Sequence, residues 1–475
     1  MKASHKNCQF DNILTKIVTY SNQKVLFKDE TLQTASYCLM DSIGCAIKSL
    51  NFQACTRLLG PMFGDKSNDH LTVKIPGTNY ALNPIEAAFN ITTMIRWLDF
   101  NDTWLAKEWG HPSDNLGAII ATTQWKSKTA GKIKIEQLLT NLIKSHEIQG
   151  VLALENSFNN VGVDHVILVK LASTAIGAHI LGLPLETQLN AISHVFLDGN
   201  ALRTYRHFPN TGSRKSWAAG DAASRAVFLL RLAEKGEMGY PKVLTAKNWG
   251  FYDTVFGGKE MILEQPFASY VMDNILFKIS FPAEFHAQTA VEAAISLHKK
   301  VINRLDEILE IRIRTHESAI RIIDKKGPLN NPADRDHCIQ YMVAVGLIFG
   351  RLQANDYEDS IAQDPRIDKI REKITCFEDA RFTRDYLDPN KRSIANGVEI
   401  QFQNGTKLEE VIVEYPLGHK KRRPEGKPFL IQKFKDNMSD HFSKEQIEEL
   451  VEFFENINEV KHKHTDFLLD KLWRG

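Results

Sequence analysis

Three short segments of the chain combine ionisable side chains with a predicted helix start. The first, residues 96–117, reads RWLDFNDTWLAKEWGHPSDNLG and carries Asp99, Asn101, Asp102, Thr103 and His111. Ser113 is the predicted N-cap of the helix that follows, because its side chain can accept from free N–H groups of the first turn. Carboxylates beside a histidine could transfer protons. The alternative is that the aspartates cap turns and His111 is a structural loop histidine.

The second segment, residues 163–173, reads VDHVILVKLAS and places a histidine at a helix start. Asp164 is the predicted N-cap, which puts His165 in the first helical turn. Imidazole titrates near neutral pH, so His165 is a candidate for acid–base chemistry. The alternative is a histidine on the protein surface without a catalytic role.

The third segment, residues 211–225, reads TGSRKSWAAGDAASR and brings two cations to a helix start. Ser216 is the predicted N-cap, and Arg214 and Lys215 come directly before it. A helix N-terminus offers unpaired N–H groups and a positive potential, so the added cations predict an anion site. Three such helix starts together would suit a substrate with several carboxylates.

The composition limits the class of protein. The chain has 475 residues with 59 Lys and Arg against 58 Asp and Glu, a net charge of +1. Such a chain has no overall field to attract nucleic acid or an anionic membrane, so neither partner is expected. None of the six cysteines forms a C-x-x-C pair, which disfavours a disulfide scaffold and an iron–sulfur cluster. Residues 1–11 lack the apolar core of a signal peptide, so we expect a cytoplasmic protein.

Several motifs of other enzyme classes are absent from the sequence. It contains no H-E-x-x-H, no Walker loop, no G-x-G-x-x-G and no G-x-S-x-G. These patterns are typical of metalloproteases, nucleotide-binding enzymes and α/β-hydrolases. We therefore expect neither a bound metal nor a cofactor.

The elements that must position these segments are mainly helices. Apolar residues recur at helical spacing in 32–50, 83–95, 117–125 and 166–181, and small residues are frequent there. Small residues let helices approach closely, which predicts a tightly packed bundle. Helix returns at 443–454, where Ser443 and Gln446 can form a capping box. We expect this tail to pack back on the first helices.

The pattern changes after about residue 273. Residues 307–315 alternate apolar and polar side chains as a half-buried strand does. Residues 398–402 and 408–415 flank Asn404-Gly405, which predicts a hairpin with a type I′ turn. Between them, 336–352 is a predicted helix. We therefore predict a helical domain from residues 1–272 and 416–475, with an α+β domain inserted at 273–415.

Long motifs of the chain closely resemble those of the MmgE/PrpD family. The resemblance covers nearly the whole chain and is carried by RWLDFNDTW…GHPSDNLG, LDGNALRTYRHFPNTGSRKSWAAGDAASRAV, KISFPAEFHAQTAVEAA, LDPNKRSIANGVEIQF and YPLGHKKRRPEGKP. It implies a mainly α fold, with a large all-helical domain built from both chain ends and a smaller inserted α+β lid domain. It also implies a homodimer that works without metal or iron–sulfur cluster.

The activity that the resemblance implies is dehydration of 2-methylcitrate to 2-methyl-cis-aconitate in the methylcitrate cycle of propionate catabolism. Activity on citrate or cis-aconitate is a further expectation. The alternative enzyme is cis-aconitate decarboxylase, the sister activity that makes itaconate. The non-enzymatic alternative is a helical interaction protein that has lost catalysis.

Site residues follow by motif from the related cis-aconitate decarboxylases. Their D-x-x-D-T-W, H-P-S, mid-domain histidine and helix-start lysine resemble the segments that contain Asp99, Thr103, His111, His165 and Lys215. The resemblance implies that His111 and His165 are the acid and the base, without deciding which is which. It also implies that Asp99 orients one of these histidines or adjusts its charge. Substrate would contact Thr103 and Lys215, together with Arg214, Asn101, Tyr341 and His286; a structural role for His286 is the alternative.

One departure from the decarboxylases concerns the segment before His111. Six residues, LAKEWG, separate Trp104 from His111, and the decarboxylases have a shorter insert. The longer insert favours the dehydratase.

Overall fold

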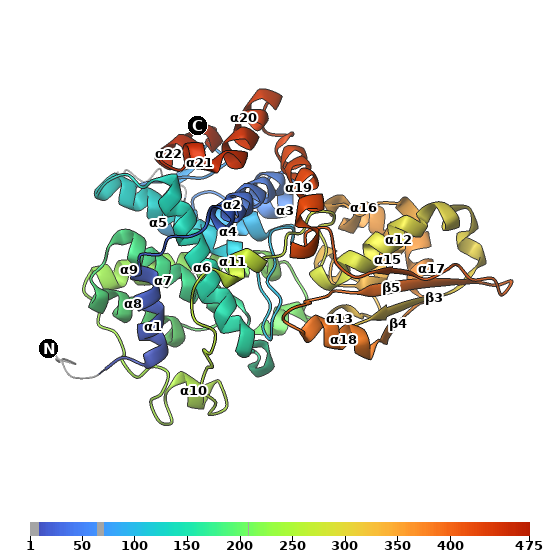
Figure 1. Ribbon diagram of the computed structural model, residues 1–475, viewed down its shortest axis with the longest axis horizontal. Coiled ribbons are helices and arrows are strands. Elements are labelled where there is room, and N and C mark those ends of the chain that lie inside the picture. Colours follow the sequence, from blue (N-terminus) through green and yellow to red (C-terminus); the bar gives the residue numbers. More distant parts are fainter. Residues whose placement is uncertain (1–8, 64–70, 208) are drawn as a thin grey trace.

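The computed structural model describes residues 9–63, 71–207 and 209–475. Figure 1 shows two bodies side by side. Helices from the beginning and the end of the chain make the larger body, and a small sheet with its own helices makes the other. The mainly α fold expected from the sequence is confirmed.

Eight helices from the first half of the chain build the larger body. Helix α9 packs against α4, α7 and α8, and α4 also packs against α2 and α5. Their bounds are α1 (Asn12–Asn22), α2 (Asp29–Ser49), α4 (Pro84–Arg96), α5 (Leu116–Thr129), α6 (Ile135–Glu155), α7 (Val166–Leu181), α8 (Leu185–Leu197) and α9 (Arg214–Glu234).

Two glycines explain how closely these helices approach. A Cβ atom on Gly117 of α5 would lie 2.1 Å from Thr92 Oγ1 of α4. A Cβ atom on Gly220 of α9 would lie 2.2 Å from Thr93 Oγ1, on the same helix α4. Only a residue without a side chain fits such contacts. The small residues noted in the sequence therefore set the tight packing of α4 between α5 and α9.

The C-terminal helices return to the larger body, as expected. They are α19 (Arg423–Met438), α20 (Lys444–Glu455), α21 (Ile457–Val460) and α22 (Asp466–Leu472). Helices α19 and α20 pack against α2, and Phe434 and Phe454 belong to the same apolar core as the first helices. The predicted capping box of Ser443 and Gln446 is present at the start of α20.

The smaller body contains a mixed four-stranded sheet in the order β4-β3-β5-β6. Strand β3 runs parallel to β4, and the other neighbours are antiparallel. Ile311 and Ile313 of β3 are buried, which confirms the predicted alternation. The strands are β3 (Ile308–Thr315), β4 (Ile374–Glu378), β5 (Asn396–Phe402) and β6 (Val411–Val413).

Helices of the smaller body build a second apolar core against this sheet. Helix α12 packs against β5, β6 and α15, and α15 packs against α17. The predicted helix at 336–352 is present but begins only at Ile339, so Asp336 and His337 precede it. The helices are α12 (Gln288–Val301), α13 (Glu317–Ile323), α15 (Ile339–Phe349), α17 (Pro365–Arg371) and α18 (Ala380–Leu387).

The hairpin at Asn404-Gly405 is present, but the predicted type I′ turn is wrong. Gly405 has a φ of +83°, whereas Asn404 is not among the residues with positive φ. The N–H of Gly405 donates to Phe402 O, and that of Phe402 donates to Thr406 O. This is a three-residue connection with glycine in the left-handed position. The extra residue shortens the second strand from the predicted 408–415 to β6.

The remaining elements are short. They are α3 (Gln53–Thr56), α10 (Phe251–Thr254), α11 (Tyr270–Asn274), α14 (Pro332–Arg335), α16 (Asp359–Ala362), β1 (Val73–Lys74) and β2 (Ala81–Leu82). Within the described ranges, no helix combines the length and hydrophobicity needed to cross a bilayer. The domain boundaries proposed at 272/273 and 415/416 stay a prediction.

Candidate active site

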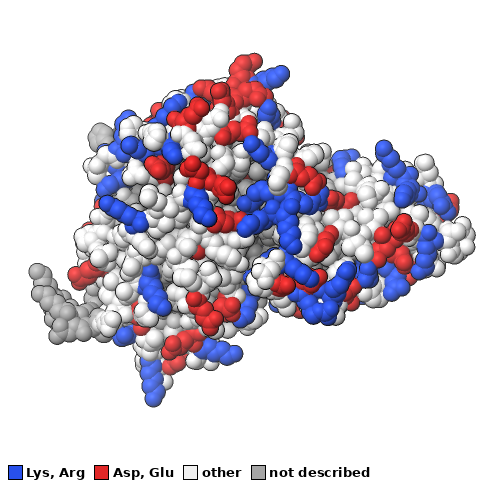
Figure 2. All heavy atoms as spheres, viewed as in Figure 1, with Lys and Arg blue, Asp and Glu red and all other residues white. Residues whose placement is uncertain are grey.

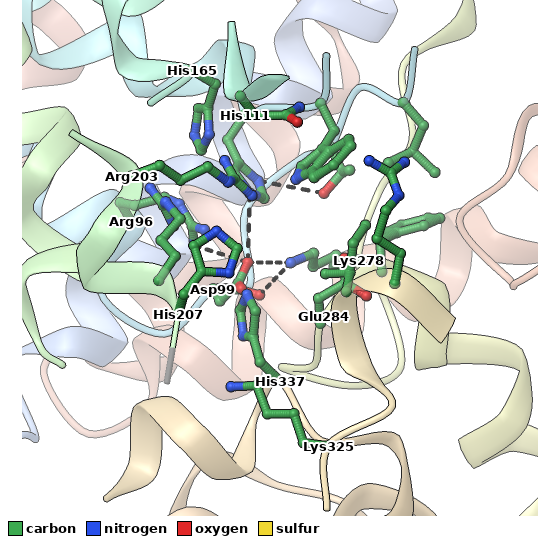
Figure 3. Close-up of a pocket in the computed structure, with 18 of the residues that line it drawn as sticks. Arg96, Asp99, His111, His165, Arg203, His207, Lys278, Glu284, Lys325 and His337 are labelled. Carbon is green, nitrogen blue, oxygen red and sulfur yellow. Dashed lines mark hydrogen bonds and ion pairs between the residues drawn. The ribbon is translucent and has the colours of Figure 1, made fainter. Parts of the chain in front are cut away.

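A cavity of about 400 Å³ lies where the two bodies meet. Part of its wall is lined by selected side chains of the helical body, the first of them Arg96 and the last Lys278. The rest is lined by side chains of the α+β body, the first of them Glu284 and the last His337. Figure 3 shows histidines, arginines and lysines from both bodies pointing toward a common space around Asp99. A small ligand held there would therefore contact both bodies.

The wall of this cavity carries an excess of positive charge. Three carboxyls line it, Asp99, Glu284 and Asp324. Among the described residues, six cationic side chains line it as well: Arg96, Arg203, Arg206, Lys278, Arg321 and Lys325. With neutral histidines the lining residues have an excess of positive charge, part of which is balanced by Asp164 behind Arg206 and Arg203. A cavity of this charge favours an anionic ligand.

Asp99 forms the centre of the cluster. Its carboxylate accepts from Lys278 Nζ and lies 2.8 Å from Arg96 Nη1. Burial alone would raise the pKa of Asp99, but Arg96 and Lys278 hold that pKa well below its ordinary value. The residue has a φ of +49°, a left-handed conformation that aspartate tolerates better than most residues. Asp99 is therefore an anion that fixes two of the cations in the wall.

His111 reaches the cavity with one nitrogen already engaged. Its Nδ1 lies 2.6 Å from the carbonyl oxygen of Asp102. A carbonyl oxygen only accepts, so Nδ1 carries the hydrogen and Nε2 of the neutral ring keeps a lone pair. Nε2 lies 3.7 Å from Asp99 Oδ1. Burial, followed by the charges of Arg96 and Lys278, lowers the pKa of His111 well below its ordinary value, so the ring is neutral at pH 7.

The segment around His111 is fixed by Asp102. Its Oδ1 accepts from the backbone N–H of Ser113 at 3.1 Å and from Ser113 Oγ at 2.6 Å. Its Oδ2 lies 2.8 Å from Nε2 of His146, a residue on α6 that the sequence did not single out. The predicted capping role of Ser113 is wrong: it lies in a 3₁₀ turn, Pro112–Asn115, ahead of α5, where its hydroxyl contacts Asp102. Asp102 therefore positions the carbonyl that sets the tautomer of His111.

His165 faces the same cavity. It is buried, and neither ring nitrogen has a hydrogen-bond partner. The ring centroid lies 6.1 Å from that of His111. Burial lowers the pKa of His165 to about 3; the charge of Asp164 opposes this shift, and the charges of Arg206 and Arg203 add to it. The alternative of an exposed surface histidine is wrong, because the ring is only 2 % exposed.

Asp164 holds the cations beside His165. Its carboxylate accepts from Nε and Nη2 of Arg206 and from the backbone N–H of Val166, the first residue of α7. Arg203 lies farther away, with its Nη1 3.8 Å from Asp164. The arginine charges keep the pKa of Asp164 low against the opposing effect of its burial. The predicted N-cap at Asp164 is wrong, because α7 begins at Val166 and His165 is the residue before it. The Asp164 side chain still accepts from the first N–H of the helix and also fixes Arg206.

Lys215 lies behind the wall and does not line the cavity. Its Nζ donates to both carboxylate oxygens of Asp336 and lies 3.0 Å from His337 Nδ1, across the boundary between the two bodies. The predicted N-cap at Ser216 is wrong, because α9 begins at Arg214 after Ser213. Lys215 is therefore inside the first turn. Burial lowers its pKa, and Asp336 opposes that shift.

The structure does not bring four other expected residues to the cavity. Arg214 Nη2 pairs with Asp221 at 2.9 Å, and its guanidinium lies over Trp217 at the surface. Tyr341 is buried in the core of the α+β body, where its Oη donates to Asp356 O at 2.6 Å.

The other two are also engaged elsewhere. Asn101 Nδ2 donates to Ser113 Oγ at 2.8 Å and to Asp114 at 3.0 Å. His286 is buried between Glu284 and Tyr386, with ring nitrogens 2.7 and 3.1 Å from their oxygens. This arrangement supports the structural alternative for His286.

Sequence reasoning missed most of the cations in the wall. Arg203 and Arg206 lie in the motif LRTYRHFPN and Lys278 in KISFPAEF, so the long motifs contained them. Arg96 is likewise the first residue of RWLDFNDTW. No local signal marked Arg321 or Lys325, since each enters the cavity only through the tertiary fold. His337 also lines the cavity, and burial followed by the charge of Lys215 lowers its pKa.

Among the residues that the structure describes, two groups of side chains have atoms close enough to hold a metal ion. One is Cys38, Asp102 and His146, and the other is Asp99, Asp336 and His337. In the first, the Asp102 carboxylate already accepts from Ser113 and contacts His146. In the second, Lys278 and Lys215 already neutralise the carboxylates. Neither donor set fits a divalent ion well, because a metal would have to displace these partners.

Known proteins are similar to this chain along nearly its whole length. Residues 16–264 match the MmgE/PrpD N-terminal domain and residues 281–458 match the MmgE/PrpD C-terminal domain. The 2-methylcitrate dehydratase of Escherichia coli (strain K12) is 57 % identical over 94 % of this chain and 93 % of its own. That of Cupriavidus necator is 57 % identical over 92 % of both chains. The mitochondrial 2-methylcitrate dehydratase of Yarrowia lipolytica is 54 % identical over 93 % of this chain and 86 % of its own. The chain belongs to the MmgE/PrpD family.

Proposed function

We propose that this protein is a hydro-lyase that removes water from 2-methylcitrate to give 2-methyl-cis-aconitate in propionate catabolism. The observation that carries the proposal is the cavity with excess positive charge around His111 and His165. 2-Methylcitrate has three carboxylates, which such a wall can bind. The names of the relatives from bacteria and yeast support this substrate.

The cations of the wall bind the carboxylates of the substrate. Arg203 and Arg206 lie on the side of His165, and Arg321 and Lys325 come from the α+β body. Guanidinium groups bind carboxylates through two parallel hydrogen bonds, which fixes orientation as well as charge. A substrate held from both bodies would keep its reacting carbons between the two histidines.

His111 is the proposed base. The proton to be removed lies on the methyl-bearing carbon, next to a carboxylate, and is only weakly acidic. Nε2 of His111 has a free lone pair and can take this proton, since Nδ1 is occupied by the Asp102 carbonyl. Asp99 Oδ1, at 3.7 Å, would stabilise the imidazolium that forms. The electron pair of the broken C–H bond forms the new double bond.

His165 is the proposed acid for the departing hydroxyl. Burial and the charges of Arg206 and Arg203 keep its ring neutral. A bound trianion counteracts those cations, so the pKa of His165 rises and the ring can carry a proton. Arg96 and Lys278 stabilise negative charge that accumulates on the carboxylate next to the reacting carbon. The hydroxyl then leaves as water.

Lys215 is proposed to act through Asp336 and His337 and not by direct contact with substrate. Its ammonium links the two bodies behind the cavity wall. Thr103 Oγ1 lies 3.4 Å from His111 Nδ1 and lines the cavity, so it remains a proposed substrate contact. Arg214, Asn101, Tyr341 and His286 are not part of the proposed site.

We also propose that catalysis is independent of metal and iron–sulfur cluster, because side chains can supply both the acid and the charge stabilisation. The homodimer and the cytoplasmic location stay predictions from the family resemblance.

Purified protein with 2-methylcitrate tests the function. Product should appear as ultraviolet absorbance of the conjugated double bond, and mass spectrometry should identify 2-methyl-cis-aconitate. The same protein with cis-aconitate should release no CO₂ and form no itaconate. Itaconate formation with no turnover of 2-methylcitrate would instead establish the decarboxylase, and no turnover of either would favour a non-enzymatic role.

A further inference from the structure

Part of the cavity wall is apolar. Leu105, Trp109, Phe285 and Ile322 line it, whereas cations and histidines make up most of the remaining wall. Leu105 and Phe285 belong to a small apolar cluster, Trp109 packs against this cluster, and Ile322 packs against the core of the α+β body. These four side chains offer no charged partner to a carboxylate.

Two of these side chains come from the insert LAKEWG that precedes His111. The insert is closed at its base, where Trp104 and Gly110 exchange backbone hydrogen bonds of 2.8 and 3.1 Å. Glu108 holds its tip: the Glu108 N–H donates to Ala153 O at 3.0 Å, and its carboxylate accepts from the N–H of Asn159 at 2.7 Å. The insert therefore presents Leu105 and Trp109 from a fixed backbone.

Cations hold the Trp109 ring in place. The guanidinium of Arg203 lies 5.1 Å from the ring centroid, and that of Arg321 lies 5.6 Å from it. The same arginines line the cavity. An apolar surface is thus placed directly beside groups that would hold the carboxylates.

We propose that Leu105, Trp109, Phe285 and Ile322 form a subsite for the methyl group of the substrate and select 2-methylcitrate over citrate. This inference rests on the proposed function. The methyl group is the one apolar substituent of the substrate, and it is attached to the carbon from which His111 takes the proton. Leu105 and Trp109 belong to the insert that directly precedes His111, and all three side chains line the same cavity.

The expected size of the effect follows from the chemistry. A single methyl or methylene group in an apolar pocket discriminates between substrates by roughly 10- to 200-fold in kcat/KM. Citrate places a hydrogen atom where 2-methylcitrate has its methyl group, so it leaves the apolar wall without a contact. Wild-type protein should therefore prefer 2-methylcitrate by about tenfold or more.

The test measures kcat/KM for citrate and for 2-methylcitrate in three variants. Leu105→Ala removes part of the subsite and should lower the preference for 2-methylcitrate by about tenfold. Leu105→Phe fills the space of the methyl group and should lower turnover of 2-methylcitrate more than that of citrate. Leu276→Ala is the matched control: Leu276 is 5 % exposed against 6 % for Leu105 and lies in the same apolar cluster, but it does not line the cavity. Its substrate preference should equal that of the wild type.

The outcomes separate the subsite from the function. Turnover of both substrates with the same preference in wild type and both Leu105 variants would overturn the subsite and leave the dehydratase intact. Absence of turnover of 2-methylcitrate in the wild type would overturn the proposed function itself. If Leu105→Ala does not fold, Ile322→Ala, at a partly exposed position of the same wall, should still lower the preference.

Discussion

The assignment of His111 as the base predicts a specific result for His111→Asn. The asparagine amide can still donate to the Asp102 carbonyl that now accepts from Nδ1 at 2.6 Å. It has no atom in the place of Nε2, which lies 3.7 Å from Asp99. The substitution therefore removes the proposed base and keeps the hydrogen bond that fixes the segment.

The expected effect on catalysis is large and that on folding is small. Loss of a general base commonly lowers kcat by roughly 10²–10⁴, about 3 to 5 kcal/mol at 1.36 kcal/mol for each factor of ten. Retention of the hydrogen bond to Asp102 limits the loss of folding free energy to about 1 kcal/mol. KM should change little, because the cations that bind the carboxylates stay in place.

The assay combines initial rates from ultraviolet absorbance with urea unfolding followed by circular dichroism. His286→Asn is a suitable control, because His286 is also buried but does not itself line the cavity, and its ring contacts Glu284 and Tyr386. It should destabilise the protein with much less effect on kcat. A His111→Asn variant with kcat within about threefold of the wild type would refute the reasoning, since general bases contribute far more than that.

Four further predictions follow from the same geometry. In the wild type, log kcat/KM should rise as pH falls from 8 to about 6.5, because the base His111 stays neutral there while the low pKa of His165 in the free protein limits the protonated acid; a kcat/KM that falls over this range would contradict the assignment. Exhaustive treatment with EDTA should leave kcat unchanged, and a loss that Fe²⁺ restores would show that a metal takes part. Lys215→Ala leaves Asp336 buried without its cation and should lower kcat by roughly 10²–10³. Lys215→Arg should restore little of this activity, because a planar guanidinium replaces a point charge. A near-wild-type kcat in Lys215→Ala would show that the contact between Lys215 and Asp336 does not contribute to catalysis. Gly117→Ala should lower the free energy of unfolding, measured by urea denaturation, by about 1–3 kcal/mol, because its Cβ would collide with α4. Gly199→Ala is the control: no atom lies within 4 Å of the added Cβ, so the free energy of unfolding should change far less.

The sequence by itself determined the family, the mainly α class and several local structures. Strand β3 and the capping box of Ser443 depend on side chains two or three residues apart, so the local pattern was sufficient to predict them. The long motifs also contained Asp99, Thr103 and His111, and a separate helix-start segment contained His165; the fold brings all four to one cavity. The physical reason is that helix caps and strand alternation are set by neighbours along the chain.

The tertiary structure decided which side chains face the cavity and which contact one another. Lys215 pairs with Asp336, 121 residues away, and Tyr341 turns into the core of the α+β body, although both have the chemistry of a substrate contact. The charge excess of the wall likewise combines arginines and lysines from segments that are distant in the sequence. Packing between the two bodies determines these partners, because a buried charge is stable only beside a counter-charge that the fold brings to it. The spacing of residues along the chain does not predict such pairs.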